Sequence, residues 1–283
     1  LVLLLASTLA TSNPLHRRDP RAIEEKMLDI ACNSFDDQYE GCSHEMEKEL
    51  AELNSKEFRK NRLYAEAWAK ATAKWQERQG RVTLPPALRT EHAVAIMVYT
   101  LPGLKKWHKK LYKKFNAAVR VAGRSPREYR DKFHFKVFHF LLTQALSILW
   151  DAEPGRCFDV YRGVPDIRFT ARLKDVIRFG QFTSTSLQKE KAEDFGTATF
   201  FSVNTCYGVP IKNFSYFRNE NEVLIPPYEK FEVTNIIQEG KRTHIHLRSK
   251  GIFSIYNCEW LKEKRCQDTP CDIRAGRGSG MDP

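Results

Sequence analysis

The spacing of apolar residues divides the chain into two halves. Up to about residue 150, apolar positions recur every three to four residues among glutamates and lysines, which is the period of a helix with one buried face. The segments with this period are 45–53, 58–75, 91–99, 107–119 and 127–150, the last of which predicts one long amphipathic helix. Prolines and glycines at 85–86, 102–103 and 123–126 separate them.

After Pro154 the period changes. Segments 160–162, 180–186, 197–203, 209–211, 222–225, 230–237 and 243–248 are short, often alternating, and rich in Val, Ile, Phe and Thr. Strands that follow helices predict an α+β fold with a sandwich-like sheet core. We expect a single domain over residues 23–262, helical to about 152 and β from about 153, followed by a tail at 263–283.

The two ends of the chain and its cysteines bear on the compartment. Residues 1–10 read LVLLLASTLA, too short to span a bilayer, so we interpret 1–12 as the remnant of a secretory signal peptide and 13–22 as a basic pro-segment. A buried N-terminal strand is the alternative. Seven cysteines without zinc spacing indicate disulfides rather than a metal site. The end, CDIRAGRGSGMDP, lacks the apolar tail of a lipid anchor, so we expect a secreted, extracellular protein without a membrane anchor.

The net charge of +11 is compatible with polyanionic or acidic partners, with anionic membranes, or with solubility alone. The densest basic run, KKWHKKLYKKF at 105–115, carries aromatic residues that could stack on bases or lie at a membrane face. An amphipathic helix with solvated lysines explains the same run more simply. We therefore expect no nucleic-acid partner.

Three segments of the β half carry candidate chemistry: YRG at 161–163, FGQFTSTS at 179–186 and ENEVLIPP at 220–227. Each alone fits a surface turn, a hydroxyl-rich sheet edge or a solvated loop. Together they suit a reaction at an anomeric carbon, in which one carboxylate stabilises a cationic centre and the other activates the attacking group. If the third segment is extended, Glu220 and Glu222 share a face with their Cα atoms roughly 7 Å apart.

An arginine, then Ser-Thr-Ser, then Glu-x-Glu resembles the R-S-ExE signature of the vertebrate arginine-specific ecto-mono-ADP-ribosyltransferases and related clostridial-type toxins. The likeness extends to SFDDQYEGC at 34–42, VYRG at 160–163, RFGQFTSTS at 178–186 and EVLIPPY at 222–228, and covers roughly residues 23–260. It implies a helical N-terminal part packed on a mixed β-sandwich ADP-ribosyltransferase core. It also implies transfer of ADP-ribose from NAD⁺ to arginine-bearing proteins or small guanidino compounds, with NAD⁺ as co-substrate and no permanently bound cofactor.

The resemblance assigns four residues to catalysis. Arg162 would hold the phosphates of NAD⁺ by fork-shaped hydrogen bonds. Ser184 would orient the nicotinamide ribose and brace Glu222. Glu222 would bond the ribose 2′-hydroxyl and stabilise positive charge at C1′ as nicotinamide leaves. Glu220 would receive the substrate arginine and help to remove its proton.

Further residues follow from the resemblance alone. Those expected around NAD⁺ are Tyr99, Gly163, Gln181, Phe195 and Ser215, with Gly163 admitting the nicotinamide amide. Ser215 also ends the glycosylation sequon Asn213-Phe214-Ser215, for which we favour the ligand role over a glycan. The implied disulfides are Cys42–Cys258 and Cys157–Cys206. Cys266 and Cys271 lie outside this implied set and could pair with each other, and Cys32 is the candidate for the unpaired cysteine.

Two alternative functions remain at this level. In an NAD⁺ glycohydrolase water would replace arginine, and the presence of Glu220 argues against that as the main activity. A basic secreted binding protein could keep the fold without activity. The joint presence of Arg162, Ser184 and Glu222 argues against it.

Overall fold

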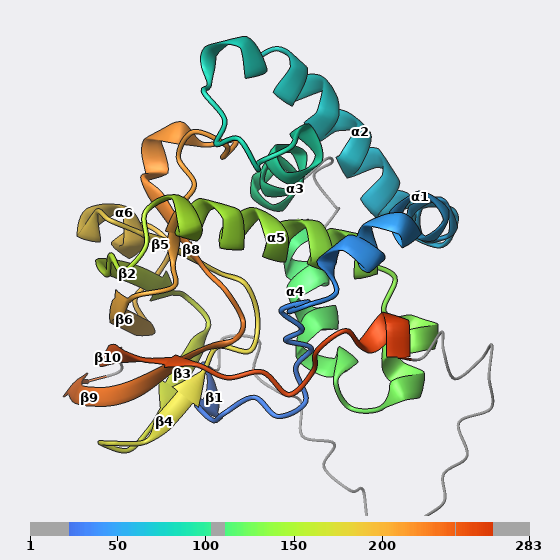
Figure 1. Cartoon of the computed structure of the whole chain (residues 1–283). Coiled ribbons are helices and arrows are strands. Elements are labelled where there is room, and N and C mark those ends of the chain that lie inside the picture. The colour runs from blue at the N-terminus through green and yellow to red at the C-terminus, as the bar shows by residue number, and fades with distance from the viewer. Residues whose placement is uncertain (1–22, 103–110, 241, 263–283) are drawn as a thin grey trace, which may run out of the picture.

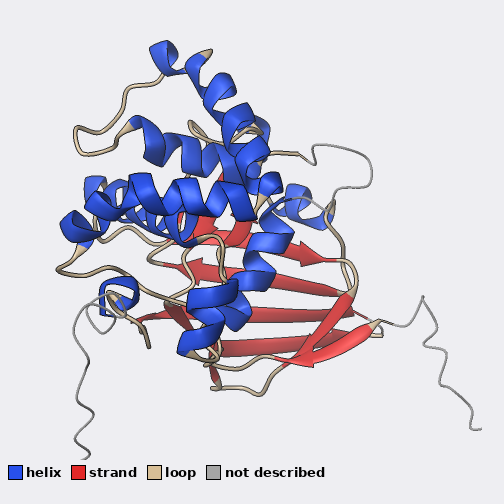
Figure 2. Cartoon of the chain, turned by 90° about the vertical axis from the view of Figure 1, so that its right-hand side faces the viewer, coloured by secondary structure: helices blue, strands red, loops and turns tan. Residues whose placement is uncertain are grey.

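The helices of the N-terminal half gather on one side of the strands of the C-terminal half (Figures 1 and 2). The computed structural model describes residues 23–102, 111–240 and 242–262. Its helical half comprises α1 (Ser43–Lys60), α2 (Arg62–Gln76), the 3-10 turn η1 (Gln79–Arg81), α3 (Thr90–Thr100), α4 (Leu111–Ala122), the π-helical turn η2 (Glu128–Lys132) and α5 (Lys136–Ala152). The expected α+β arrangement is confirmed.

The prediction of a single helix over 127–150 is wrong, because the helical conformation is interrupted between η2 and α5. Glu57 of α1 accounts for the break. One carboxylate oxygen accepts the N–H of Lys136 at 2.7 Å, and the other accepts that of Val137 at 3.1 Å. These N–H groups have no acceptor within their own helix, and a buried carboxylate stabilises such a helix start. A side chain of α1, distant in the sequence, therefore stabilises the start of α5 at Lys136.

Eight strands form one mixed sheet in the order β4-β9-β10-β6-β2-β5-β8-β7, and β1 pairs with β3 in a small parallel sheet. The strands are β1 (Glu24–Met27), β2 (Phe158–Val164), β3 (Ile167–Thr170), β4 (Val176–Arg178), β5 (Thr183–Ser186), β6 (Thr199–Thr205), β7 (Val209–Pro210), β8 (Glu222–Ile225), β9 (Glu229–Glu239) and β10 (Arg242–Ile252). The short helix α6 (Lys189–Glu193) and the turn η3 (Arg218–Glu220) lie between strands. The sequence did not predict β1, β3 and β4, which have only three or four residues and no clear alternation.

The sheet folds back on itself between β2 and β5. β2 pairs with β6 from Phe158 to Val164, but with β5 only at Tyr161 and Ser186. One buried cluster combines residues of β8 with residues of β2, β6, β9 and β10: Val160, Phe201, Val203, Val223, Ile225, Phe231, Val233, Ile245 and Leu247. The two parts of the sheet therefore enclose an apolar layer, as the predicted sandwich requires.

A second buried cluster joins the helices to the start of β5. The rings of Phe115 in α4 and Phe182, which directly precedes β5, stack with centroids 5.6 Å apart. Leu224 of β8 belongs to the same cluster. This packing brings α3 and α4 to the Ser-Thr-Ser segment.

Two disulfides tie the chain together, Cys42–Cys258 and Cys157–Cys206, with the pairing that the resemblance implies. Cys32 is a free, exposed thiol. The expected signal remnant, pro-segment and C-terminal tail lie outside the described residues, as do Cys266 and Cys271. Within the described ranges, no helix is long and apolar enough to cross a membrane.

Candidate functional site

A cavity of about 920 Å³ opens where β2 and β5 part, and its size suits a small-molecule ligand. Segment 26–34, α4, the end of α3 and the strands β2, β5 and β8 contribute to its wall. Eight of the nine site residues proposed from the sequence line it: Tyr99, Arg162, Gly163, Gln181, Ser184, Phe195, Glu220 and Glu222. The ninth, Ser215, is fully buried and contacts Glu222.

Glu222 begins β8 opposite Ser186 of β5 and is only 5% exposed. The hydroxyl of Ser215 donates to its Oε2 at 3.3 Å. The pKa of Glu222 is raised from 4.5 to about 7, chiefly by burial and in addition by the charge of Glu220. Hydrogen bonds from Ser184 and Ser215 and the charge of Arg162 oppose that rise. The site thus holds a poorly solvated carboxylate, which would interact strongly with a cationic centre in the cavity.

Glu220 reaches the cavity by a different backbone path from the expected one. The prediction that the Glu-x-Glu segment is extended is wrong. Glu220 ends the 3-10 turn η3, and Asn221 adopts a left-handed conformation with φ of 43° before β8 begins. The end of β5 holds this turn, since the Ser186 hydroxyl donates to the Glu220 carbonyl at 2.7 Å. The turn, rather than the alternation of a strand, brings both carboxylates to the cavity.

Arg162 of β2 bridges the gap between the two parting strands. Its Nη1 donates to the carbonyl of Ser184 at 2.7 Å, which uses one of the five N–H groups of the guanidinium. The side chain is half-buried and lines the cavity. A guanidinium in this position can bind a phosphate through its other N–H groups.

Gly163 follows Arg162 at a position where a side chain would not fit. An added Cβ would lie 2.2 Å from the carbonyl oxygen of Ala192 and 2.3 Å from that of Gly196. The glycine therefore lets the segment after α6 pack on β2. That segment carries Phe195, which is 51% exposed at the cavity.

Sequence reasoning missed the cavity-lining face of α4, formed by Tyr112, Asn116 and Arg120. Their spacing of four places them on one side of the helix, which was the available signal. Nδ2 of Asn116 donates to the hydroxyl of Tyr99 at 3.1 Å, and that hydroxyl donates to the carbonyl of Phe182 at 2.8 Å. Tyr99 is thereby fixed against the start of β5.

Arg120 adds positive charge close to Arg162. It is hydrogen-bonded to Gln181, and its pKa is lowered first by burial and then by the charge of Arg162. Two guanidinium groups that repel one another across a cavity favour an anionic ligand between them. Of the basic run at 105–115, the described part is helical, with Tyr112 at the cavity and Phe115 in the core.

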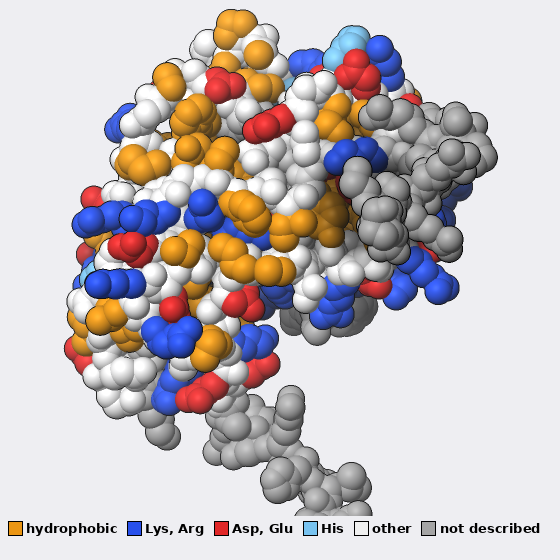
Figure 3. All heavy atoms as spheres, turned by 60° about the horizontal axis from the view of Figure 1, so that its bottom comes forward, with side chains coloured by type: hydrophobic (Ala, Val, Ile, Leu, Met, Phe, Trp, Pro, Cys, Tyr) orange, Lys and Arg blue, Asp and Glu red, His pale blue; other side chains and the backbone are white. Residues whose placement is uncertain are grey.

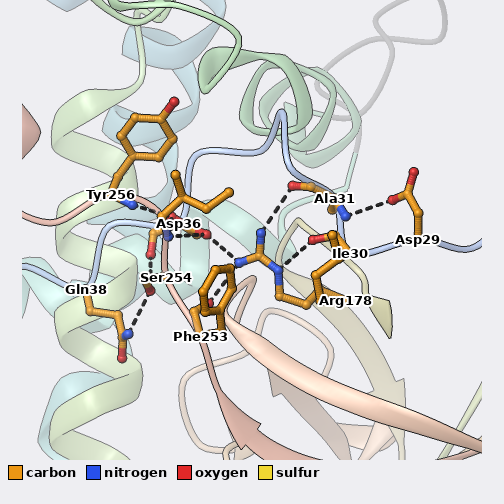
Figure 4. A network of polar contacts seen from close by, with 10 residues as sticks. Asp29, Ile30, Ala31, Asp36, Gln38, Arg178, Phe253, Ser254 and Tyr256 are labelled. Carbon is orange, nitrogen blue, oxygen red and sulfur yellow. Dashed lines mark hydrogen bonds and ion pairs between the residues drawn. The ribbon is translucent and has the colours of Figure 1, made fainter. Parts of the chain in front are cut away.

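A buried ion pair holds the N-terminal wall of the cavity (Figure 4). Arg178 of β4 pairs with Asp36 and donates to the carbonyls of Ile30 at 2.7 Å and Ala31 at 3.2 Å. Asp36 also accepts the N–H groups of Ile255 and Tyr256, at 2.9 and 3.0 Å. The segment between Ile30 and Asp36 is thereby fixed to both β4 and the C-terminal part of the chain.

Within the ranges that the structure describes, no cluster of three His, Cys, Asp or Glu side chains could hold a metal ion. The polar side chains that line the cavity include two carboxylates, several hydroxyls and two guanidinium groups near one another, those of Arg120 and Arg162.

Comparisons with known proteins agree on one family. A family model described as NAD:arginine ADP-ribosyltransferase matches residues 28–254. The chain is 50% identical to the erythroblast NAD(P)(+)--arginine ADP-ribosyltransferase of Gallus gallus, over 99% of this chain and 91% of the relative. It is 44% identical to the GPI-linked NAD(P)(+)--arginine ADP-ribosyltransferase 1 of Homo sapiens, over 95% of this chain and 85% of the relative.

Solved structures give the same result. The eucaryotic mono-ADP-ribosyltransferase ART2.2 superposes with a TM-score of 0.70 at 37% identity, covering 82% of this chain and 98% of that one. A mutant of ART2.2 in complex with NADH also gives a TM-score of 0.70, at 36% identity and the same coverage.

Proposed function

Because the chain belongs to the NAD:arginine ADP-ribosyltransferase family, we propose that it transfers ADP-ribose from NAD⁺ to arginine guanidinium groups and releases nicotinamide. The observation that carries the proposal is the buried carboxylate of Glu222 at a cavity that also holds Arg162 and Glu220. A buried anion that faces a ligand cavity suits a reaction that develops positive charge.

In the first step, the bond between nicotinamide and the ribose C1′ breaks. Arg162 binds the phosphates of NAD⁺, and the cationic neighbour Arg120 strengthens the positive potential there. Glu222, braced by Ser184 and Ser215, bonds the ribose 2′-hydroxyl and stabilises the positive charge at C1′. Nicotinamide leaves as a neutral molecule that takes both electrons of the broken bond. Tyr99, Gly163, Gln181 and Phe195 complete the NAD⁺ site in this proposal.

In the second step, a guanidinium nitrogen forms the new bond to C1′. A free guanidinium has a pKa above about 12, so it must lose a proton as that bond forms. Glu220 accepts this proton and orients the acceptor. Its place at the end of η3, where it lines the cavity close enough for its charge to act on Glu222, supports this role.

One assay tests the function against both alternatives. The protein is incubated with NAD⁺ labelled in the adenosine part and with agmatine, and labelled agmatine and free nicotinamide are measured in parallel. We expect both products in comparable amounts. Nicotinamide without labelled agmatine would indicate an NAD⁺ glycohydrolase, and neither product would indicate an inactive binding protein.

We further propose that the enzyme is extracellular and secreted without a membrane anchor. The two disulfides support an oxidising compartment. Because the human relative is GPI-linked, the anchor is the point to test. Retention at the surface of a secretory host cell, with release by phospholipase, would contradict the secreted form.

A further inference from the structure

The helical half holds the loop at residues 211–217, which precedes η3 and leads to Glu220. The ring of Trp75, near the end of α2, stacks on Phe214 with centroids 5.9 Å apart. Thr100, the last residue of α3, accepts the N–H of Tyr216 on its hydroxyl oxygen at 2.9 Å. The loop therefore depends on side chains more than a hundred residues earlier in the chain.

Arg78 makes the most specific of these contacts. Its Nη1 donates to the carbonyl of Ser215 at 2.8 Å, and its Nη2 donates to that of Tyr216 at 3.2 Å. The carbon at the centre of the guanidinium lies 5.8 Å from the centroid of the Tyr216 ring. The rigid fork of an arginine can bind two successive carbonyls in this way, whereas a lysine is a single point donor.

Further hydrogen bonds link the segment held by Arg78 to both carboxylates of the site. Ser215, whose carbonyl Arg78 holds, donates its hydroxyl to Glu222 at 3.3 Å. The same hydroxyl oxygen accepts the N–H of Phe217 at 3.1 Å, and Phe217 directly precedes η3. Arg78 itself does not line the cavity.

We infer that Arg78 is a positioning residue for the transfer reaction, which acts through Ser215 on Glu222 and through the start of η3 on Glu220. The inference rests on the proposed function, in which Glu220 orients the acceptor guanidinium and accepts its proton. A change at Arg78 should then affect arginine transfer more than NAD⁺ cleavage by water. It should also alter the pH at which Glu222 ionises, because the Ser215 hydrogen bond favours the ionised form.

The test uses the full chain with Arg78→Met, which keeps the aliphatic length but removes the donors, and Arg78→Lys, which keeps the charge. Arg81→Met is the matched control, because Arg81 is an exposed arginine of the adjacent turn η1. Agmatine transfer, nicotinamide release in water, the pH profile of that release and the melting temperature are measured for each protein.

We expect Arg78→Met to lower agmatine transfer by about tenfold, in keeping with the loss of positioning hydrogen bonds, and to raise the KM for agmatine. The pH midpoint of NAD⁺ cleavage should rise, Arg78→Lys should recover part of both effects, and Arg81→Met should match the wild type. If Arg78→Met does not fold, Arg78→Lys carries the same readouts.

Two results would overturn the inference. One is wild-type transfer and an unchanged pH midpoint in Arg78→Met. The other is an equal loss of transfer and cleavage at an unchanged midpoint with a lower melting temperature, which a merely structural role would produce. Absence of transfer in the wild type would instead count against the proposed function, and the pH midpoint of NAD⁺ cleavage would still decide the role of Arg78.

Discussion

Two buried carboxylates of this protein have contrasting surroundings. Asp36 is fully buried, and Arg178 together with the backbone N–H groups of Ile255 and Tyr256 compensates its charge. Glu222 is almost as buried, but its partners are the hydroxyls of Ser184 and Ser215, and the charge of Glu220 opposes its ionisation. In the described part of the chain, no basic side chain forms an ion pair with Glu222. The first carboxylate has its ion-pair partner within the fold, whereas the second has hydroxyl partners among the described residues and, when ionised, can face a cationic ligand centre in the cavity.

The largest expected effect is the loss of unfolding free energy when Asp36 is replaced. Asp36→Ala leaves the guanidinium of Arg178 buried without its anion, a change that typically costs about 3–5 kcal/mol of unfolding free energy. Urea denaturation should detect a loss of that size. As a control, Glu52→Ala breaks the exposed pair with Lys56 and should cost no more than about 0.5 kcal/mol. A loss below about 1 kcal/mol for Asp36→Ala would mean that the pair does not hold the fold.

Glu222, the proposed catalytic carboxylate, should show the opposite behaviour. Glu222→Gln keeps the shape but removes the negative charge that faces the cavity, so transfer and NAD⁺ cleavage should both fall by about 10²–10³-fold or more. Because ionising a buried carboxylate costs stability, the melting temperature above pH 7 should stay equal or rise. Near-normal turnover by a stable variant would remove Glu222 from its proposed role.

Glu220→Gln sharpens the contrast between the two glutamates of the site. Transfer to agmatine should fall by about 10²-fold, the lower end of what a positioned proton acceptor contributes, while cleavage of NAD⁺ by water persists. Both products are measured on one preparation. An equal decrease in both would assign Glu220 to the NAD⁺ step, and no decrease in either would show that Glu220 does not act on the acceptor.

The smallest expected effect is on the pH profile. Since the pKa of Glu222 in the folded protein is raised from 4.5 to about 7, and the ionised form is the active one, kcat/KM for NAD⁺ cleavage should rise with pH through neutrality. At pH 6 it should be about a tenth of its plateau. Ser215→Ala should move the midpoint upward, because the lost hydrogen bond favours the carboxylate. A midpoint near 4.5 would show that burial does not perturb Glu222.

The sequence predicted the features that depend on neighbouring residues. The order of helices followed by strands, and most element positions, follow from the hydrophobic period, because each depends on neighbouring residues. The Ser-Thr-Ser and Glu-x-Glu segments were recognisable for the same reason. The break before α5 was not, because Glu57, which lies 79 residues before Lys136, causes it.

By itself, the sequence determined that a helical half precedes a β half and which chemical groups are available for the site. Only the tertiary structure decided how those groups lie and which charges remain uncompensated. It replaced the expected extended segment at Glu220 with a turn, because Ser186 of another strand holds that turn. It also brought Arg78 to Ser215 across 137 positions and Asp36 to Arg178 across 142. Burial and charge compensation depend on such distant neighbours, so no local pattern contains them.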